Sequence, residues 1–234
     1  MHLQDKIILV TGAAGNLGRA VAQAFADQGA KLVLLDLRRD SLEHSYGAET
    51  ATRQFVAANL LEQDAVHAAV QAAVARFGRI DGLCNLAGGF RMGEAVHETQ
   101  DRTWDFLMDL NARTLLHMAR AVVPHMLERG GGKIVNVGAA SAQRGVAAMG
   151  AYCAAKSSVI RLTEAMAGEL REQGINVNCV LPTIIDTPEN RAAMPDADPQ
   201  RWVAPQDLAQ VIVFLASDAA RAVHGAAVPV SGLS

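Results

Sequence analysis

The sequence of 234 residues has few cysteines, no excess of one charge and no long apolar run. Its three cysteines, Cys84, Cys153 and Cys179, lie far apart and match no metal-binding or redox spacing. An odd number of cysteines fits a reducing compartment better than a disulfide framework. No apolar run is long enough to span a bilayer, and no signal peptide precedes the first expected strand. We therefore expect a cytoplasmic protein that binds no membrane.

The charge balance excludes a further class of function. The formal net charge is -3, with acidic and basic residues interspersed along the chain. Because there is no basic patch, we expect no nucleic-acid partner. His117 and His125 lie two helical turns apart, which is too far for a metal pair, so no metal site is predicted. Half of the residues are hydrophobic, which is enough for one domain with a sizeable core over 1–234.

Short apolar runs alternate with helical patterns along the whole chain. Strands are predicted at 6–10, 31–35, 54–57, 82–86, 133–137, 176–181 and 226–230. Helices are predicted at 17–28, 62–77, 104–128, 151–172 and 208–217. Strands without polar alternation are buried on both faces, and strands that alternate with helices form a parallel sheet. The sequence therefore predicts an α/β fold with a doubly wound parallel sheet.

The segment 183–205 is the least regular part of the chain. It contains Pro188, Pro195, Pro199 and Pro205 together with several acidic residues. In an open α/β sheet, a loop after a late strand lies over the carboxyl ends of the strands, where ligands bind. Its length favours a lid over a substrate pocket rather than a plain surface connection.

A glycine-rich turn joins the first predicted strand to the first helix. Gly12, Gly15 and Gly18 lie within the run Thr-Gly-Ala-Ala-Gly-Asn-Leu-Gly. Glycines let the backbone turn tightly and approach a pyrophosphate, which rests on the N-terminus of the helix. Because the turn opens a strand–helix–strand unit, it is typical of a dinucleotide-binding site.

Asp36 ends the second predicted strand, 18 residues after Gly18. A carboxylate at this point accepts hydrogen bonds from both hydroxyls of an adenosine ribose and repels a 2′-phosphate. A helix cap or turn residue is the alternative, and the glycine-rich turn favours the cofactor role. NAD(H) is therefore the preferred cofactor, while Arg38 and Arg39 are close enough that NADP(H) stays open.

Tyr152 and Lys156 stand four residues apart at the head of a predicted helix, so their side chains share one face. A free phenol has a pKa of about 10 and is a poor base at neutral pH. A cation held beside it lowers that pKa toward the working range. On its own, this spacing more often marks an exposed lysine beside a packed tyrosine. In a chain that also carries a dinucleotide-binding motif, it predicts an acid–base pair.

These motifs together resemble the short-chain dehydrogenase/reductase family over nearly the whole chain. Further matches are Asn85-Leu86-Ala87-Gly88, Asn111, the strand 133–137, and Leu181-Pro182 before Thr187. The resemblance implies a single Rossmann domain of seven strands and an NAD(P)-dependent oxidoreductase that moves a hydride between nicotinamide and a small organic substrate. It implies that Tyr152 donates or accepts the proton, that Lys156 binds the nicotinamide ribose, and that Asn111 holds a water in the proton relay.

The resemblance also implies the cofactor contacts and the assembly. The implied cofactor residues lie mostly in loops beyond the strands: Gly12, Gly15, Asn16, Leu17, Gly18, Asp36, Asn59, Leu60, Ala87, Gly88, Gly89, Tyr152, Lys156, Pro182, Ile185 and Thr187. Family members pair the helices that correspond to 104–128 and 151–172, which implies a homodimer or homotetramer.

The chain departs from the family pattern at two informative positions. Asn16 stands where glycine is usual, and asparagine is the next-best residue for a positive φ, so we expect the turn to survive. The catalytic serine is expected 13 residues before Tyr152, where this chain has Ala139. Ser141 is two residues out of register, and is either a displaced catalytic serine or an ordinary loop residue.

One branch of the family, the dihydropteridine reductases, also lacks this serine. The segments 84–90 and 186–202 resemble loops of that branch. Reduction of a ketone builds negative charge on oxygen, so a second hydrogen-bond donor helps, whereas a quinonoid pterin leaves no localised alkoxide. Tyr152 alone then suffices, which makes a quinonoid dihydropterin-like compound a candidate substrate.

Two other functions stay open. An ordinary ketone or alcohol dehydrogenase would use Tyr152 and Lys156, with Ser141 as a further donor. A nucleotide-binding regulator without chemistry would explain Ala139. The presence of Tyr152, Lys156 and Asn111 in register argues against the regulator.

Overall fold

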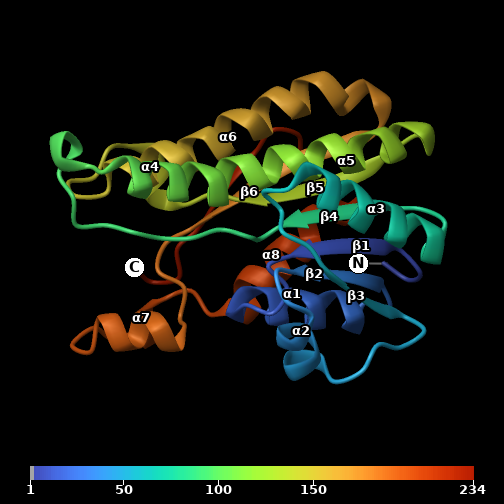
Figure 1. The fold of residues 1–234 in the computed structure, drawn as a ribbon, viewed down its shortest axis with the longest axis horizontal. Helices are drawn as coiled ribbons and strands as arrows, with labels where there is room; N and C mark the ends of the chain where they lie inside the picture. Colours follow the sequence, from blue (N-terminus) through green and yellow to red (C-terminus); the bar gives the residue numbers. More distant parts are fainter. Residues whose placement is uncertain (1–2) are drawn as a thin grey trace.

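Seven parallel strands form one sheet in the order β3-β2-β1-β4-β5-β6-β7 in the computed structural model, which describes residues 3–234 (Figure 1). The strands are β1 (Ile7–Thr11), β2 (Lys31–Asp36), β3 (Arg53–Ala57), β4 (Gly82–Asn85), β5 (Gly132–Val137), β6 (Ile175–Pro182) and β7 (Ala227–Val230). The strand order reverses between β1 and β4, and ligands of open α/β sheets bind beyond the carboxyl ends at such a point. The predicted single-domain Rossmann fold is confirmed.

Helices cover both faces of the sheet (Figure 1). One face carries α1 (Asn16–Asp27), α2 (Arg39–Tyr46) and α8 (Pro205–Leu215). The other carries α3 (Gln63–Phe77), α4 (Asp101–Met108), α5 (Thr114–Glu128) and α6 (Gly150–Leu170). The short α7 (Pro188–Ala193) projects from the edge beyond β6, on the same side of the molecule as the free end of α4.

The core forms because alternate strand residues point to opposite faces. In β1, Ile8 and Val10 pack with α1 and α8, whereas Ile7 and Leu9 pack with α3 and α5. Every residue of β1 and β6 is buried, as expected for central strands of a parallel sheet. The apolar strand runs in the sequence therefore lie where a two-sided core needs them.

Three features of the helices differ from the sequence prediction. The predicted helix 104–128 begins at Asp101 and is interrupted by a π-helical turn at Asp109–Arg113. The sequence does not predict α2, because only Leu42 in it is buried and no apolar period shows. Within the segment 183–205, α7 forms after Thr187, whose hydroxyl accepts a hydrogen bond from the backbone of Asn190.

A buried polar network joins β4, β5 and α6. Asn85 Nδ2 donates to Asn136 Oδ1 at 2.8 Å, and Asn136 Nδ2 donates to Thr163 Oγ1 at 2.9 Å. Asn136 and Thr163 are completely buried, so these groups depend on one another for hydrogen bonds. The network fixes α6 against the sheet, and α6 carries Tyr152 and Lys156.

Thr163→Val tests this network. Valine has nearly the same shape but cannot accept the hydrogen bond from Asn136, so a buried N–H loses its partner. Such a loss costs about 1–3 kcal/mol, and we expect a fall of that size in the free energy of unfolding measured by urea denaturation. The control is Ser158→Ala on the same helix, because the Ser158 hydroxyl donates only to the carbonyl of Ala154. An unchanged urea midpoint for Thr163→Val would show that the network does not stabilise the fold.

Candidate active site

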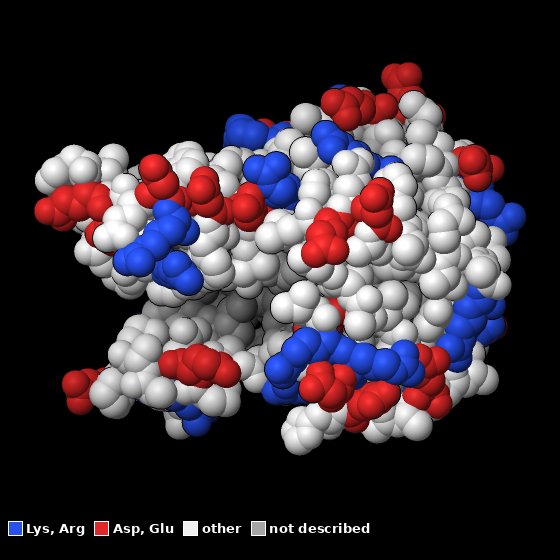
Figure 2. Space-filling model, viewed as in Figure 1, with Lys and Arg blue, Asp and Glu red and all other residues white. Residues whose placement is uncertain are grey.

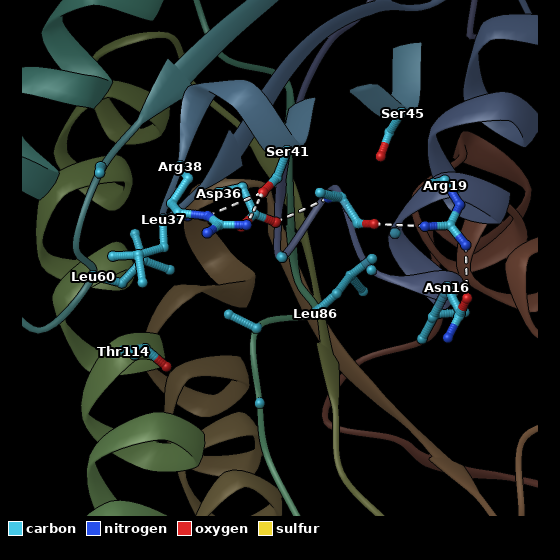
Figure 3. Close-up of a pocket in the computed structure, with 18 of the residues that line it drawn as sticks. Asn16, Arg19, Asp36, Leu37, Arg38, Ser41, Ser45, Leu60, Leu86 and Thr114 are labelled. Atoms are coloured by element: carbon cyan, nitrogen blue, oxygen red, sulfur yellow. Dashed lines mark hydrogen bonds between the residues drawn. The ribbon is translucent and has the colours of Figure 1, made fainter. Parts of the chain in front are cut away.

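A cavity of about 1080 Å³ opens beyond the carboxyl ends of β1, β2 and β4 (Figure 3). Most of the predicted cofactor residues line it: Gly12, Gly15, Asn16, Leu17, Gly18, Asp36, Asn59, Leu60, Ala87, Gly88 and Thr187. The other predicted residues lie outside its wall: Gly89, Tyr152, Lys156, Pro182 and Ile185. Its size exceeds the roughly 300–1,000 Å³ of most small-ligand sites, which suits a dinucleotide.

The glycine-rich turn is held against the loop that follows β4. Gly12 has a φ of +62°, and a side chain there would begin 3.0 Å from the backbone nitrogen of Ala87. The Thr11 hydroxyl accepts hydrogen bonds from the backbone of Leu86 and Ala87, at 3.0 and 3.1 Å. Any side chain at Gly18 would collide with the carbonyl oxygen of Gly12. Glycine is therefore required at the two ends of the turn for a positive φ and for close packing.

The reason expected for Asn16 is wrong. Asn16 is the first residue of α1 and has no positive φ. Its Oδ1 accepts a hydrogen bond from Arg19 at 2.6 Å, and its Nδ2 donates to Glu189 Oε2 at 2.7 Å. Since Glu189 belongs to α7, the side chain that replaces the usual glycine ties the turn to the segment 183–205.

Asp36 lies at the opposite end of the cavity from Asn16 and Arg19 (Figure 3). Its Oδ2 accepts a hydrogen bond from the backbone of Ala14 at 2.9 Å, and its Oδ1 accepts one from the backbone of Leu37 at 2.8 Å. A carboxylate offers about four acceptor positions, so each oxygen can still accept a ligand hydroxyl. The carboxylate both shapes the turn and faces the cavity.

The two arginines after Asp36 have different surroundings. Arg39 pairs with Glu43 and Glu49 and does not line the cavity. Arg38 lines the cavity, with its guanidinium 3.1 Å from the Ser41 hydroxyl. Ser41 and its neighbours on α2 are cavity residues that the sequence did not reveal, because α2 itself carries no clear pattern.

Lys156 and Asn111 meet at Gly88. A Cβ atom placed on Gly88 would lie 2.8 Å from Asn111 Oδ1 and 3.2 Å from Lys156 Nζ. Lys156 is buried, its Nζ donates to the carbonyl of Val137 at 2.8 Å, and burial lowers the pKa of the ammonium to about 8. Side chains from two different elements thus converge on one backbone position beside the cavity.

The π-helical turn gives Asn111 its position. Asn111 Nδ2 donates to the carbonyls of Leu107 and Gly89, at 2.9 and 3.0 Å, and its Oδ1 accepts from the backbone of Gly89 at 3.1 Å. π-Helical turns often occur at functional sites because they free backbone groups for other partners. The Asn111 side chain is therefore engaged in holding the loop after β4, with one Oδ1 acceptor position left over.

Tyr152 lies in the first turn of α6 with its ring edge-on to Phe90, at 4.8 Å between centroids. Burial raises the pKa of Tyr152 to about 12, with a smaller contribution from Cys153. The predicted lowering of this pKa by Lys156 is not seen in the protein alone, where burial is the main cause of the shift and the Lys156 ammonium donates to the carbonyl of Val137. At neutral pH the phenol is a protonated acid.

Ser141 and Tyr152 form no hydrogen bond with one another in the described part of the chain. Ala139 is buried in a small apolar cluster against which Tyr152 packs. Ser141 is half-buried in the next turn, and within residues 3–234 its hydroxyl makes no hydrogen bond and shares no cavity wall with Tyr152. The position of the usual family serine is thus filled by a methyl group.

A second cavity, of about 170 Å³, lies beside Tyr152. The loop after β4 supplies Arg91 and Glu94 to its wall, and the start of α6 supplies Tyr152. The sequence reasoning missed Arg91 and Glu94, since no motif marks them. The one available signal is their place directly after the Gly88-Gly89 turn.

Comparisons with known proteins agree with this geometry. A family model described as Enoyl-(Acyl carrier protein) reductase matches residues 12–232. The chain is 34% identical to D-threitol dehydrogenase of Mycolicibacterium smegmatis, over 99% of this chain and 93% of that protein. It is 32% identical to a 3-oxoacyl-[acyl-carrier-protein] reductase of Thermotoga maritima, over 99% and 98% of the two chains.

A solved structure shows the same likeness. The 3-ketoacyl-(acyl-carrier-protein) reductase of Brucella melitensis, complexed with NADH, has a TM-score of 0.88 and 31% identity over 98% of each chain. The chain belongs to the short-chain dehydrogenase/reductase family and is an NAD(P)-dependent oxidoreductase. The alternative of a regulator without chemistry is therefore set aside. Within residues 3–234, none of the helices has the length and apolarity that a membrane crossing requires.

The raised pKa of Tyr152 gives a direct test. The chain has two tyrosines, Tyr46 and Tyr152, and burial raises the pKa of both. In a titration followed by phenolate absorbance, the folded protein should form almost no phenolate up to about pH 10, where a free phenol is half ionised. The denatured protein serves as the reference with two ordinary phenols. A phenolate that forms near neutral pH and is absent from Tyr152→Phe would contradict this result.

Proposed function

We propose that the protein interconverts a small secondary alcohol and its ketone, with NAD(H) as the preferred cofactor. The observation that carries the proposal is the convergence of Asn111 and Lys156 on Gly88, which lines the large cavity two residues before Phe90, the residue whose ring contacts Tyr152. The relatives named above are a threitol dehydrogenase and two oxoacyl reductases, whose names describe alcohol and ketone chemistry. That chemistry supports an ordinary dehydrogenase as the first candidate.

The residues of the large cavity fit a dinucleotide. The amide end of α1 and its glycine-rich turn suit a pyrophosphate, because backbone N–H groups at a helix N-terminus bind anions. Asp36 would accept the hydroxyls of the adenosine ribose, and Asn59 and Leu60 would contact the adenine. Lys156 would donate to the nicotinamide ribose. When bound, nicotinamide supplies or accepts the hydride.

The chain that follows β6 would close the end of the cofactor site that holds the nicotinamide. Pro182 ends β6, and Ile185 and Thr187 follow in the segment 183–205, which we propose acts as the lid of the substrate site. The Asn16–Glu189 hydrogen bond supports this, since it joins the lid to the turn that faces the cofactor.

Tyr152 would supply the proton. A buried phenol with a raised pKa is protonated at neutral pH, so it donates to the oxygen of a ketone during reduction. In the reverse direction it accepts the proton of the alcohol. The proton is replaced from solvent, and the remaining acceptor position of Asn111 would hold a water for this relay.

A quinonoid dihydropterin-like substrate is the second candidate. Ala139 favours it, because no hydroxyl stands beside Tyr152 at the usual serine position. An oxygen that develops negative charge would meet one donor, which is a disadvantage for a ketone and none for a quinonoid ring. The relatives named above act on alcohols and ketones, so this candidate ranks second.

Assembly and location are part of the proposal. Trp104 on α4 is 44% exposed, and Leu116 and Leu127 on α5 are 38% and 37% exposed. These exposed large apolar residues along 104–128 support pairing of that helix, together with the neighbouring helix 151–172, in a homodimer or homotetramer. Location in the cytoplasm stays a prediction.

The two substrate candidates differ in their response at Ala139. NADH oxidation should be measured with small neutral ketones and with quinonoid dihydropterin. Loss of one oxyanion donor typically costs about 10²–10³-fold, so Ala139→Ser should raise ketone reduction and leave pterin reduction nearly unchanged. Ser141→Ala is the control and should leave ketone reduction unchanged. Turnover of the pterin alone would overturn the first candidate, and collapse of ketone reduction in Ser141→Ala would show that Ser141 is the displaced serine.

Cofactor preference depends on Asp36. A 2′-phosphate placed against this carboxylate should lose about 1–3 kcal/mol, or several-fold to a hundred-fold in affinity. Calorimetry should therefore show tighter binding of NADH than of NADPH. If NADPH binds equally well and Arg38→Ala removes that binding, then Arg38 reaches the phosphate and the preference for NAD(H) is refuted.

A further inference from the structure

The cavity beside Tyr152 is small and contains one basic and one acidic side chain. Its wall includes Arg91, Glu94, Met149 and Tyr152, and its volume is about 170 Å³. Sites for drug-sized ligands are larger, at roughly 300–1,000 Å³. The cavity therefore suits a substrate that extends only a few atoms beyond the carbon next to Tyr152.

Arg91 is held in a fixed orientation. Its guanidinium carbon lies 3.8 Å from the centroid of the Phe106 ring on α4. Stacking on an aromatic face fixes the plane of a guanidinium and leaves its N–H groups free at the edge. Less side-chain freedom is then lost when the N–H groups bind a ligand.

Among the ion pairs formed by residues 3–234, none includes Arg91. Glu94 is the acidic residue on the wall of the same cavity, and its carboxylate forms hydrogen bonds with other groups. Its Oε1 accepts from the Thr103 hydroxyl at 3.0 Å, and its Oε2 accepts from the backbone of Gln100 at 3.2 Å. These bonds hold Glu94 at the start of α4 rather than on Arg91.

The surface around this region is open to solvent. Figure 2 shows a hollow between the part of the molecule that carries α4 and the part that carries α7, with both basic and acidic side chains on the α4 side. Arg91 is itself exposed, so a soluble anion can reach it. A guanidinium next to a reacting centre attracts an anionic substrate.

We propose that Arg91 binds an anionic group of the substrate, a carboxylate or a phosphate, a few bonds from the carbonyl carbon that is reduced. The proposal rests on the alcohol–ketone function above and names its substrate class as short oxo acids or oxo phosphates and their alcohols. The forked N–H groups of arginine match both anions through two parallel hydrogen bonds. Tyr152 and Arg91, on the wall of one small cavity, fix the two ends of such a substrate.

Matched pairs of ketones test Arg91 directly. Reduction by NADH is measured for levulinate and its methyl ester, and for dihydroxyacetone phosphate and dihydroxyacetone. Arg91→Gln should lower kcat/KM for the anionic member of a pair by about 10- to 100-fold, mainly through KM. It should leave the neutral member within about twofold. The pair that responds tells whether the anion is a carboxylate or a phosphate.

Two further variants control for charge and shape. Arg102→Gln removes the same charge from an exposed position on α4 outside the cavity wall and should leave both members of each pair unchanged. Arg91→Lys keeps the charge without the planar fork and should recover only part of the loss. The proposal would be overturned if Arg91→Gln lowered kcat/KM equally for anionic and neutral ketones. It would also be overturned if the Arg91→Gln variant still preferred the anionic ketone of each pair.

Binding measurements separate this proposal from the proposed function. Calorimetry of levulinate and dihydroxyacetone phosphate with the NADH complex reads the anion site without turnover. If the native protein binds either anion, Arg91→Gln does not, and no ketone is reduced, then the Arg91 site stands and the ketone function is overturned. If ketones are reduced but neither anion binds in a way that depends on Arg91, then the ketone function stands and the Arg91 site is overturned.

Discussion

The proposed site depends on the absence of a side chain at Gly88. Asn111 from the π-helical turn and Lys156 from α6 both approach this residue so closely that a Cβ atom would collide with Asn111 Oδ1. The same loop is bound from the other side by the Thr11 hydroxyl of β1. The end of β1, the π-helical turn and the start of α6 therefore meet at one stretch of backbone, which joins the large cavity to the neighbourhood of Tyr152.

Burial sets the protonation of the site. It raises the pKa of Tyr152 to about 12 and lowers that of Lys156 to about 8, so the two groups are pushed toward their neutral forms. In the protein alone, no effect of Lys156 on the pKa of Tyr152 offsets this, and the Lys156 ammonium donates to the carbonyl of Val137. A protonated phenol is suited to reduction, and oxidation at neutral pH requires that the bound ligands favour the phenolate.

Much of the fold could be predicted from the sequence, because the apolar strand runs and the glycine-rich turn are local signals. In the cavity wall, the glycine-rich turn and Asp36 at the end of β2 could be predicted from their spacing, whereas residues such as Asn59 and Leu60 were implied only by the family resemblance. The π-helical turn could not be predicted, since no residue pattern in 104–128 marks it. The contact of Asn16 with Glu189 and the stacking of Arg91 join residues distant in the sequence, and only the folded chain brings them together.

The central claim is that Tyr152 is the proton donor while the rest of the site binds the cofactor. The most direct measurement compares Tyr152→Phe with the native protein in single-turnover NADH oxidation and in calorimetric NADH binding. The account predicts unchanged NADH affinity and a rate lower by about 10²–10⁴-fold, the usual contribution of one positioned acid. A near-native rate in Tyr152→Phe with normal NADH binding would contradict it, since the proton would then come from another group.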